Sequence, residues 1–321
     1  MIKLKVSLCI TVLNELDSIP QMARDLSKQT MRPDEIVVVD GGSEDGTVDK
    51  ITEQLETLAP LLIHTVPGAN IATGRNLCMG YASGDIIVFL DAGLGLGADW
   101  LRSLVAAVDL GADVAYGVVL PDPVGIFEHA LAAVTLPQFD EIDSGKYFPS
   151  GGSMAGRKDL YQNQPFPEWL DHGEDMWLDL KWRSEGLELQ MVPEAIVTFR
   201  PRRSIRQFYK QYYNYARGDG VAGMWLYRHG LRFVSYAALL TILLKSAEFW
   251  FLWPPLMGLG FWYQRLPFKR WRKSSTLFPL KNRVFGILLI LFIRVVGDAA
   301  KIVGFISGSL IRMRRWKWWH P

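Results

Sequence analysis

Strand-like and helix-like segments alternate through the first two hundred residues, and no other feature limits the possible folds as much. Apolar runs typical of buried strands lie at 6–14, 35–40, 61–66 and 85–91. Between them, apolar residues recur every three or four positions, as on one face of a helix. This order predicts βαβ units and a parallel sheet. We expect it to continue with a helix near 98–109, a strand near 113–120 and an irregular, loop-rich stretch to about 165. A helix over 174–186 and a strand over 187–199 would close the domain.

Polar side chains follow these predicted strands at the points where the strands end. Thr11, Asn14, Asp40 and Asp91 all lie at such ends. In open α/β sheets, ligands bind outside the carboxyl ends of the strands. A dinucleotide-binding dehydrogenase would need a glycine-rich turn after the first strand, and "TVLNELDS" has no glycine. Carboxylates and amides can instead recognise a nucleobase and a ribose by hydrogen bonds.

Four segments resemble, in order and spacing, family 2 glycosyltransferases of the GT-A fold: "SLCITVLNE", "EIVVVDGGSEDGT", "GRNLCMGYASGDIIVFLDAG" and "GED". The "DAG" form, with "RPR", "QYYNYARGDG" and "GDAAKIVG" further on, resembles a bacterial and archaeal subgroup of membrane-associated enzymes. The resemblance implies an α/β GT-A domain over 1–220, followed by a basic, apolar, helical membrane-associated region over 221–321. It also implies a nucleotide-diphosphate-sugar donor and inversion at the anomeric carbon.

The resemblance further implies which residues form the site. Asp175 in "GED" would be the general base, because a carboxylate in contact with a sugar hydroxyl can take its proton as the new bond forms. Arg75 would lie close to the diphosphate, and Asp91 by the ribose and a metal. The glycines of "PSGGSMAGR" (149–157) would form a flexible lip under the acceptor, or a plain turn. The residues implied for the donor site are Thr11, Asn14, Glu15, Asp40, Ser43, Arg75, Asp91, Gly93, Glu174 and Arg202.

Several of these residue types also fit an ordinary structural role. Asp40 could simply start the turn "DGGS", and Asn14 could cap the next helix. Arg75 could be a surface charge on a helix. Glu174 is either a partner lying behind Asp175 or a solvated charge at the start of a helix, where acidic residues are favoured.

The expected metal site lacks its second acid, because Gly93 stands where a carboxylate could share a divalent ion with Asp91. Mg²⁺ or Mn²⁺ needs few protein ligands when diphosphate oxygens and water supply the rest. We therefore expect a weakly held Mg²⁺ or Mn²⁺ with Asp91 as its ligand. Arg200, Arg202 and Arg203 could stabilise a leaving diphosphate in place of a metal, or could be charges at a membrane surface.

The charge of the chain changes sign near residue 200. Residues 1–199 hold 13 Lys and Arg against 30 Asp and Glu, and residues 200–321 hold 22 against 3. A basic, apolar region indicates nucleic acid or an anionic membrane. Long apolar runs and clustered tryptophans favour the membrane, so we expect no nucleic-acid partner. Cys9 and Cys78 are too few for a disulfide framework and indicate a reducing compartment.

Two apolar segments, 231–263 and 284–311, dominate the basic region. Charged residues and a Pro-Pro pair divide the first into pieces shorter than the ~20 residues that a spanning helix needs. The second carries one polar stripe of Arg294, Asp298 and Lys301. Both flanks of the first segment are basic, which predicts that both face the cytoplasm. We expect re-entrant or interfacial helices on the cytoplasmic face of the cell membrane; the alternative is a buried helical subdomain of a soluble protein.

These features predict an inverting, membrane-associated glycosyltransferase whose hydroxyl acceptor belongs to a lipid-linked glycan or an envelope polysaccharide precursor, such as a polyprenyl-linked sugar. Two alternatives stay open: a polyprenyl-phosphate sugar synthase, and a catalytically inactive protein that binds nucleotide sugars, because "DAG" departs from the metal motif. A processive polysaccharide synthase is disfavoured, since "QYYNY" (211–215) keeps only the glutamine of Q-x-x-R-W. The donor sugar, its base and the oligomeric state stay open at this point.

Overall fold

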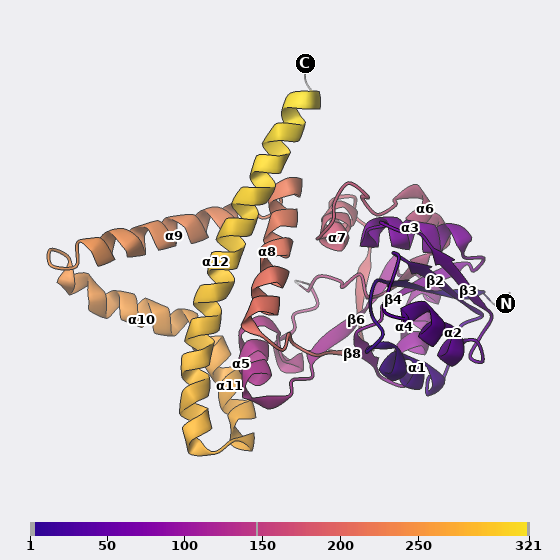
Figure 1. Cartoon of the computed structure of the whole chain (residues 1–321), viewed down its shortest axis with the longest axis horizontal. Helices are drawn as coiled ribbons and strands as arrows, with labels where there is room; N and C mark the ends of the chain where they lie inside the picture. The colour runs from indigo at the N-terminus through magenta and orange to yellow at the C-terminus, as the bar shows by residue number, and fades with distance from the viewer. Residues whose placement is uncertain (1–3, 146, 320–321) are drawn as a thin grey trace. The chain divides into compact units, whose positions relative to one another are not determined.

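The computed structural model describes residues 4–145 and 147–319, which form two compact units (Figure 1). Unit 1 comprises Met1–Asp122 and Phe139–Arg200, and unit 2 comprises Pro123–Gln138 and Pro201–Pro321. This division differs from the expected boundary at residue 220. The reason is that helix α8 (Ile205–Ala222) packs along helix α12 (Leu280–Trp319), so it belongs to unit 2.

Unit 1 is built on one eight-stranded sheet with the order β3-β2-β1-β4-β7-β6-β8-β5. The strands are β1 (Val6–Val12), β2 (Glu35–Asp40), β3 (Leu61–Thr65), β4 (Ile86–Asp91), β5 (Leu94–Leu96), β6 (Val114–Pro121), β7 (Ser153–Arg157) and β8 (Leu189–Phe199). The first four strands pair in parallel, as the sequence predicts. The later part of the sheet departs from the predicted parallel arrangement, because β7 runs antiparallel to both β4 and β6, and β5 runs antiparallel to β8.

Helices cover both faces of this sheet. The helices of unit 1 are α1 (Ile19–Ser27), α2 (Thr47–Leu55), α3 (Ile71–Tyr81), α4 (Trp100–Asp109), α6 (Lys158–Asn163) and α7 (Glu174–Ser184), with a short 3₁₀ turn at Phe139–Glu141. Successive strand residues face opposite sides. Leu8 and Ile10 therefore pack with α1, α2 and α4, whereas Cys9 packs with α3, α6 and α7. Cys9 and Cys78 are both buried and free, as expected for small apolar core residues.

The stretch from 122 to 165 is more regular than the sequence predicts. It contains α5 (Gly125–Thr135), which belongs to unit 2, and then β7 and α6. The sequence of β7, "SMAGR", is short and contains glycine, so it resembles a turn. Burial between two neighbouring strands makes it a strand instead. The expectation of a flexible lip is therefore wrong for residues 153–157.

Unit 2 is helical, and its longest contact joins α8 to α12 (Figure 1). Its further helices are α9 (Leu226–Leu244), α10 (Trp253–Tyr263) and α11 (Arg265–Ser274), with 3₁₀ turns at Trp250–Leu252 and Ser275–Leu277. Glycines allow α8 and α12 to approach closely. A Cβ at Gly304 would collide with the backbone oxygen of Tyr213, and one at Gly308 with that of Arg217.

A polar network joins α8, α9 and α12 inside unit 2. His229 Nε2 lies 2.9 Å from an oxygen of Asp219, and His229 Nδ1 lies 3.1 Å from a guanidinium nitrogen of Arg232. Arg232 Nε and the Tyr236 hydroxyl each donate to Asp298 at 3.1 Å. Asp219 of "GDG" and Asp298 of "GDAAK" therefore connect neighbouring helices through hydrogen bonds. The predicted polar stripe of Arg294, Asp298 and Lys301 is present on α12, but Asp298 accepts hydrogen bonds from α9.

None of the helices in 4–145 and 147–319 is both long enough and apolar enough to cross a membrane. The predicted interruption of 231–263 is confirmed, because α9 ends before Lys245 and α10 begins at Trp253 with prolines in its first turn. Large apolar side chains are nevertheless exposed on both helices, among them Leu240, Leu244, Phe261 and Trp262.

We predict that Gly304→Ala destabilises unit 2, because the new methyl group would meet backbone that cannot rotate away. Overpacking of this kind costs about 1–3 kcal/mol. The matched control is Gly260→Ala on α10, where an added Cβ meets nothing within 4 Å. Alanine there should be neutral or slightly stabilising, since it is a better helix former than glycine. Thermal unfolding of the two variants measures the difference; equal melting temperatures would contradict the packing described.

Candidate active site

Three strands bring the predicted polar residues to one edge of the sheet in unit 1. In register, Thr11 on β1 pairs with Asp91 on β4, and Val12 pairs with Asp40 on β2. β2 and β3 lie on one side of β1, whereas β4 lies on the other, so the strand order reverses at β1. Such a reversal is where open α/β sheets bind ligands. Thr11, Asp40 and Asp91 therefore lie together at one edge of the sheet, as predicted from their positions at strand ends.

Arg75, on α3, joins the end of β4 to the start of α7. Its guanidinium donates from Nη1 to Glu174 Oε1 at 2.7 Å and from Nη2 to Asp91 Oδ1 at 3.1 Å. The central carbon of the guanidinium, Cζ, lies 5.2 Å from the centre of the Phe166 ring. Only 2% of the Arg75 side chain is exposed, against 5% of Glu174. The alternatives of a surface charge for Arg75 and a solvated charge for Glu174 are therefore wrong.

Negative charge exceeds positive charge around this guanidinium. Burial and the neighbouring Asp175 raise the pKa of Glu174 to about 7, although Arg75 acts in the opposite direction. Burial disfavours a charged guanidinium, but Asp91, Glu174 and Asp175 together raise the pKa of Arg75. One turn further along α7, Asp179 is buried, and no hydrogen-bond partner for its carboxylate lies within the described chain. Burial, together with Asp175, raises the pKa of Asp179 as well.

Two adjacent glycines close the site from the side of β7. The Gly151 N–H donates to Asp175 Oδ2 at 3.0 Å, and the Gly152 carbonyl accepts from the Asp91 N–H at 3.1 Å. A Cβ at Gly151 would collide with the Arg75 guanidinium, and one at Gly152 with the Asp91 carboxylate. The paired glycines in "PSGGSMAGR" were therefore a usable signal, although for close packing rather than for a mobile lip.

The loops after β1 and β2 hold each other in place. Asn14 has a left-handed backbone (φ 55°). Its N–H donates to Ser43 Oγ at 2.8 Å, and its side-chain oxygen accepts from the Glu44 N–H at 3.0 Å. The next N–H, that of Glu15, donates to Thr47 Oγ1 at 2.9 Å. The alternative role of Asn14 as a cap of the next helix is wrong, because the N-cap of α1 is Ser18 and Asn14 connects the two loops instead. Its role at the donor site stays a prediction.

Asp40 is fully buried at the start of the second loop. Its carboxylate accepts hydrogen bonds from the Gly42 N–H at 3.2 Å and the Ser43 N–H at 3.0 Å. Asp40 therefore does stabilise the turn "DGGS", and its recognition of a nucleobase stays a prediction. At the neighbouring strand end, the side chain of Thr11 packs so close to Gly74 of α3 that a Cβ there would lie 2.9 Å from it.

Of the two carboxylates at this edge, Asp40 is fully buried, which leaves Asp91 as the expected metal ligand. The Asp91 side chain is 41% exposed, and one of its oxygens already pairs with Arg75. Across residues 4–145 and 147–319, no group of three or more His, Cys, Asp or Glu side chains is arranged to hold a metal. Gly93 is exposed, and the nearest atom to an added Cβ is Ser18 Oγ at 4.0 Å. Arg202 belongs to unit 2, where its Nε donates to Gln211 Oε1 at 3.3 Å.

Phe166 and Asp179 also contribute to this site and were not predicted from the sequence. Phe166 lies in a loop, and only the folded chain brings its ring to Arg75. Asp179 follows Asp175 by four residues, so helical spacing places both on the same side of α7. That spacing was a signal available in the sequence.

Known proteins resemble this chain in sequence and in fold. The family model described as glycosyl transferase family 2 matches residues 7–163. The O-antigen chain rhamnosyltransferase of Salmonella typhimurium is 25% identical over 273 residues, which cover 77% of this chain and 84% of that relative. An undecaprenyl-phosphate 4-deoxy-4-formamido-L-arabinose transferase of Serratia proteamaculans is 32% identical over 115 residues. That match covers 34% of this chain and only 35% of the relative.

Among solved structures, a mannosyltransferase from Pyrobaculum calidifontis, in complex with GDP-Man and Mn²⁺, matches with a TM-score of 0.57. The match covers 95% of this chain and 87% of the other at 18% identity, so it establishes the fold alone. The mixed α/β sheet of unit 1 is thus GT-A-like, as the sequence predicts. Taken together, the motifs, the sheet and the family match show that the chain belongs to glycosyl transferase family 2 and is a glycosyltransferase.

Proposed function

We propose that this enzyme transfers a sugar, with inversion, from a nucleotide-diphosphate donor to a hydroxyl group of a lipid-linked acceptor. The observation that carries the proposal is the position of Asp175. It begins α7 next to the buried Glu174, and the Gly151 N–H orients one of its oxygens. Two names support the substrate classes: the Pyrobaculum mannosyltransferase binds GDP-Man, and the Serratia relative is named for undecaprenyl phosphate.

The proposed reaction needs one proton transfer and one displacement. The Asp175 carboxylate takes the proton of the acceptor hydroxyl as that oxygen bonds to the anomeric carbon. The bond from the anomeric carbon to the diphosphate oxygen breaks, and the nucleotide diphosphate leaves with the electron pair. Attack from the face opposite the leaving group inverts the configuration.

The remaining residues hold this arrangement. Arg75 fixes Glu174 and Asp91, so the start of α7 and the end of β4 keep a constant spacing. Asp175 follows Glu174 directly and is positioned by the same contact. Asp91, Thr11 and Asp40 would face the nucleoside, and Arg75 remains a predicted neighbour of the diphosphate.

A phosphate acceptor is the second candidate, as in a polyprenyl-phosphate sugar synthase. The undecaprenyl-phosphate transferase named above favours it, although the match spans about a third of that protein. A phosphate oxygen is already ionised, so this reaction would not need Asp175 as a base. The inactive alternative has no support, because the matched family and relatives are glycosyltransferases.

We predict that Asp175→Asn lowers the rate of sugar transfer by roughly 10²-fold or more, the usual contribution of a general base, while donor binding is kept. Asp109→Asn is the matched control, because Asp109 is an exposed carboxylate at the end of α4. Transfer assays measure the rates, and calorimetric titration with nucleotide sugars measures binding. Unchanged transfer by Asp175→Asn would refute a role as base and favour the phosphate acceptor.

We further propose that Mg²⁺ or Mn²⁺ acts with the donor, with Asp91 as its protein ligand. The fit is limited to one carboxylate, so diphosphate oxygens and water would complete the coordination. When bound, the ion would neutralise charge on the leaving diphosphate. The acidic surroundings of Arg75 support the need for such a cation. The Pyrobaculum structure contains Mn²⁺.

We predict that Gly93→Asp strengthens metal binding, because it adds a carboxylate two residues after Asp91 where there is space for a side chain. The Mn²⁺ concentration that gives half-maximal donor binding should fall by about 10-fold, since the number of charged ligands tunes such affinities. Gly93→Asn is the control of equal size without the charge. Full activity of the unaltered enzyme in excess chelator would contradict the metal proposal.

We also propose that unit 2 lies in the membrane interface on the cytoplasmic side. Exposed leucines and aromatic side chains on α9 and α10 support this, because soluble surfaces seldom expose so many large apolar groups. Basic residues in α11 and at the flanks of these helices would attract anionic lipid. An interfacial position requires no spanning helix.

We predict that the protein stays with membranes in 1 M salt and is released by detergent. At that ionic strength the Debye length falls to about 3 Å, so charge attraction is screened, whereas apolar insertion is not. Replacing Leu240 and Leu244 together by Asp should shift protein into the soluble fraction. Leu110→Asp, at the most exposed leucine of unit 1, should not. Sedimentation after each wash gives the result, and release by salt alone would refute insertion.

A further inference from the structure

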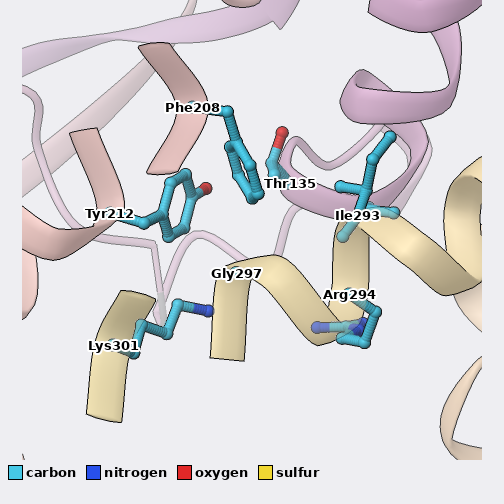
Figure 2. Close-up of a pocket in the computed structure, with 8 residues that line it drawn as sticks. Thr135, Phe208, Tyr212, Ile293, Arg294, Gly297 and Lys301 are labelled. Carbon is cyan, nitrogen blue, oxygen red and sulfur yellow. The ribbon is translucent and has the colours of Figure 1, made fainter. Parts of the chain in front are cut away.

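Unit 2 contains a pocket of about 110 Å³ between the end of α5, α8 and the middle of α12 (Figure 2). Phe208 forms one apolar wall. The side chains with polar ends that line it are Thr135, Tyr212, Arg294 and Lys301. A water molecule in the liquid occupies about 30 Å³, so the space is that of a few waters or one phosphate group. The residues that line it belong to unit 2, whereas those of the candidate active site belong to unit 1.

Two cationic side chains enter this pocket from α12. Arg294 and Lys301 are seven residues apart, which places them on one side of the helix about two turns apart. Figure 2 shows the nitrogen ends of both pointing toward the space beside Gly297. That space depends on the glycine, because a Cβ there would lie 2.9 Å from the ring of Phe208.

Neither cation has a carboxylate partner among the residues that the structure describes. The Arg294 guanidinium lies 4.7 Å from the centre of the Tyr263 ring, and the Lys301 ammonium lies 4.8 Å from that of Tyr212. Arg294 Nε is buried, and the described chain offers it no hydrogen-bond partner. The acid between them, Asp298, has its two oxygens engaged by α9.

This arrangement is costly unless an anion joins it. Burial lowers the pKa of Lys301 to about 8; Asp298 raises it, and Arg232 and Arg294 lower it further. A buried charge without a counter-ion is unfavourable. A negatively charged ligand between Arg294 and Lys301 would remove both the repulsion and the unmet hydrogen-bonding capacity.

We propose that this pocket binds a phosphate group, held by Arg294 and Lys301 with the Tyr212 hydroxyl as a third donor. Guanidinium and ammonium groups form strong, charge-assisted hydrogen bonds to phosphate oxygens. The volume suits a phosphate group. The phosphate could belong to a lipid or be free in solution, and the proposal does not depend on the sugar-transfer reaction.

The test is thermal unfolding of the full-length protein in detergent, without nucleotide, at increasing concentrations of three probes. These are dioctanoyl phosphatidic acid, inorganic phosphate, and dioctanoylglycerol as the lipid without phosphate. A ligand that binds the folded state raises the melting temperature. We expect stabilisation by phosphatidic acid and none by dioctanoylglycerol. If inorganic phosphate raises the melting temperature by a similar amount, the pocket is a site for free phosphate. If inorganic phosphate has a much weaker effect than phosphatidic acid, the pocket is a site for the phosphate of a lipid.

Variants locate the effect. Arg294→Gln and Lys301→Gln should each raise the half-maximal phosphatidic acid concentration by about 10-fold or more, the scale of a lost charge-assisted contact. Lys281→Gln, which removes an exposed charge from the same helix, should change nothing. Without phosphate, the two pocket variants should be at least as stable as the unaltered protein, because each removes an unmatched charge. Absence of stabilisation by both phosphate probes, or an unchanged response of both pocket variants, would overturn the proposal.

Discussion

The contact of the Arg75 guanidinium with Asp91 and Glu174 holds the candidate active site together. It joins α3, the end of β4 and the start of α7, three segments that are far apart in the sequence. Removing one partner of a buried ion pair typically costs about 3–5 kcal/mol, because the other charge stays buried. The glycines at 151 and 152 complete the contact, since any side chain there would push into it. The orientation of Asp175 depends on these contacts, because Glu174 precedes it directly and the Gly151 N–H donates to its carboxylate.

Electrostatics distinguishes the two units. In unit 1, one buried guanidinium faces Asp91, Glu174 and Asp175. Burial and the neighbouring Asp175 raise the pKa of Glu174. A diphosphate entering such a site would add more negative charge, which is a physical reason to expect an accompanying cation. Unit 2 has the opposite imbalance, because Arg294 and Lys301 face a pocket without a carboxylate. The charge change along the sequence thus corresponds to an acidic cluster around Arg75 in unit 1 and a pair of cationic side chains, Arg294 and Lys301, in unit 2.

The strand ends were predictable because hydrophobic runs ending in polar residues are local signals. This applies to Thr11, Asp40 and Asp91, and to the parallel order of the first four strands. The partner role of Glu174 was one of two alternatives, and burial decided between them. Helix α5 and strand β7 were missed because tertiary burial, rather than local periodicity, determines them. The link that Asn14 makes between two loops could not be predicted, because its hydrogen-bond partners lie about thirty residues away.

Helix α5 also has a consequence for how the protein is made. It is encoded between β6 and β7, yet its buried residues Ala130 and Leu131 pack with Ile290 and Ile293 of α12. During translation at about 5–20 residues per second, α5 would wait roughly ten to thirty seconds for these partners. Unit 1 can close once β8 has left the ribosome, while α5 still exposes its apolar side. The nascent chain would therefore need a chaperone or a lipid surface to shield this one helix until synthesis is nearly finished.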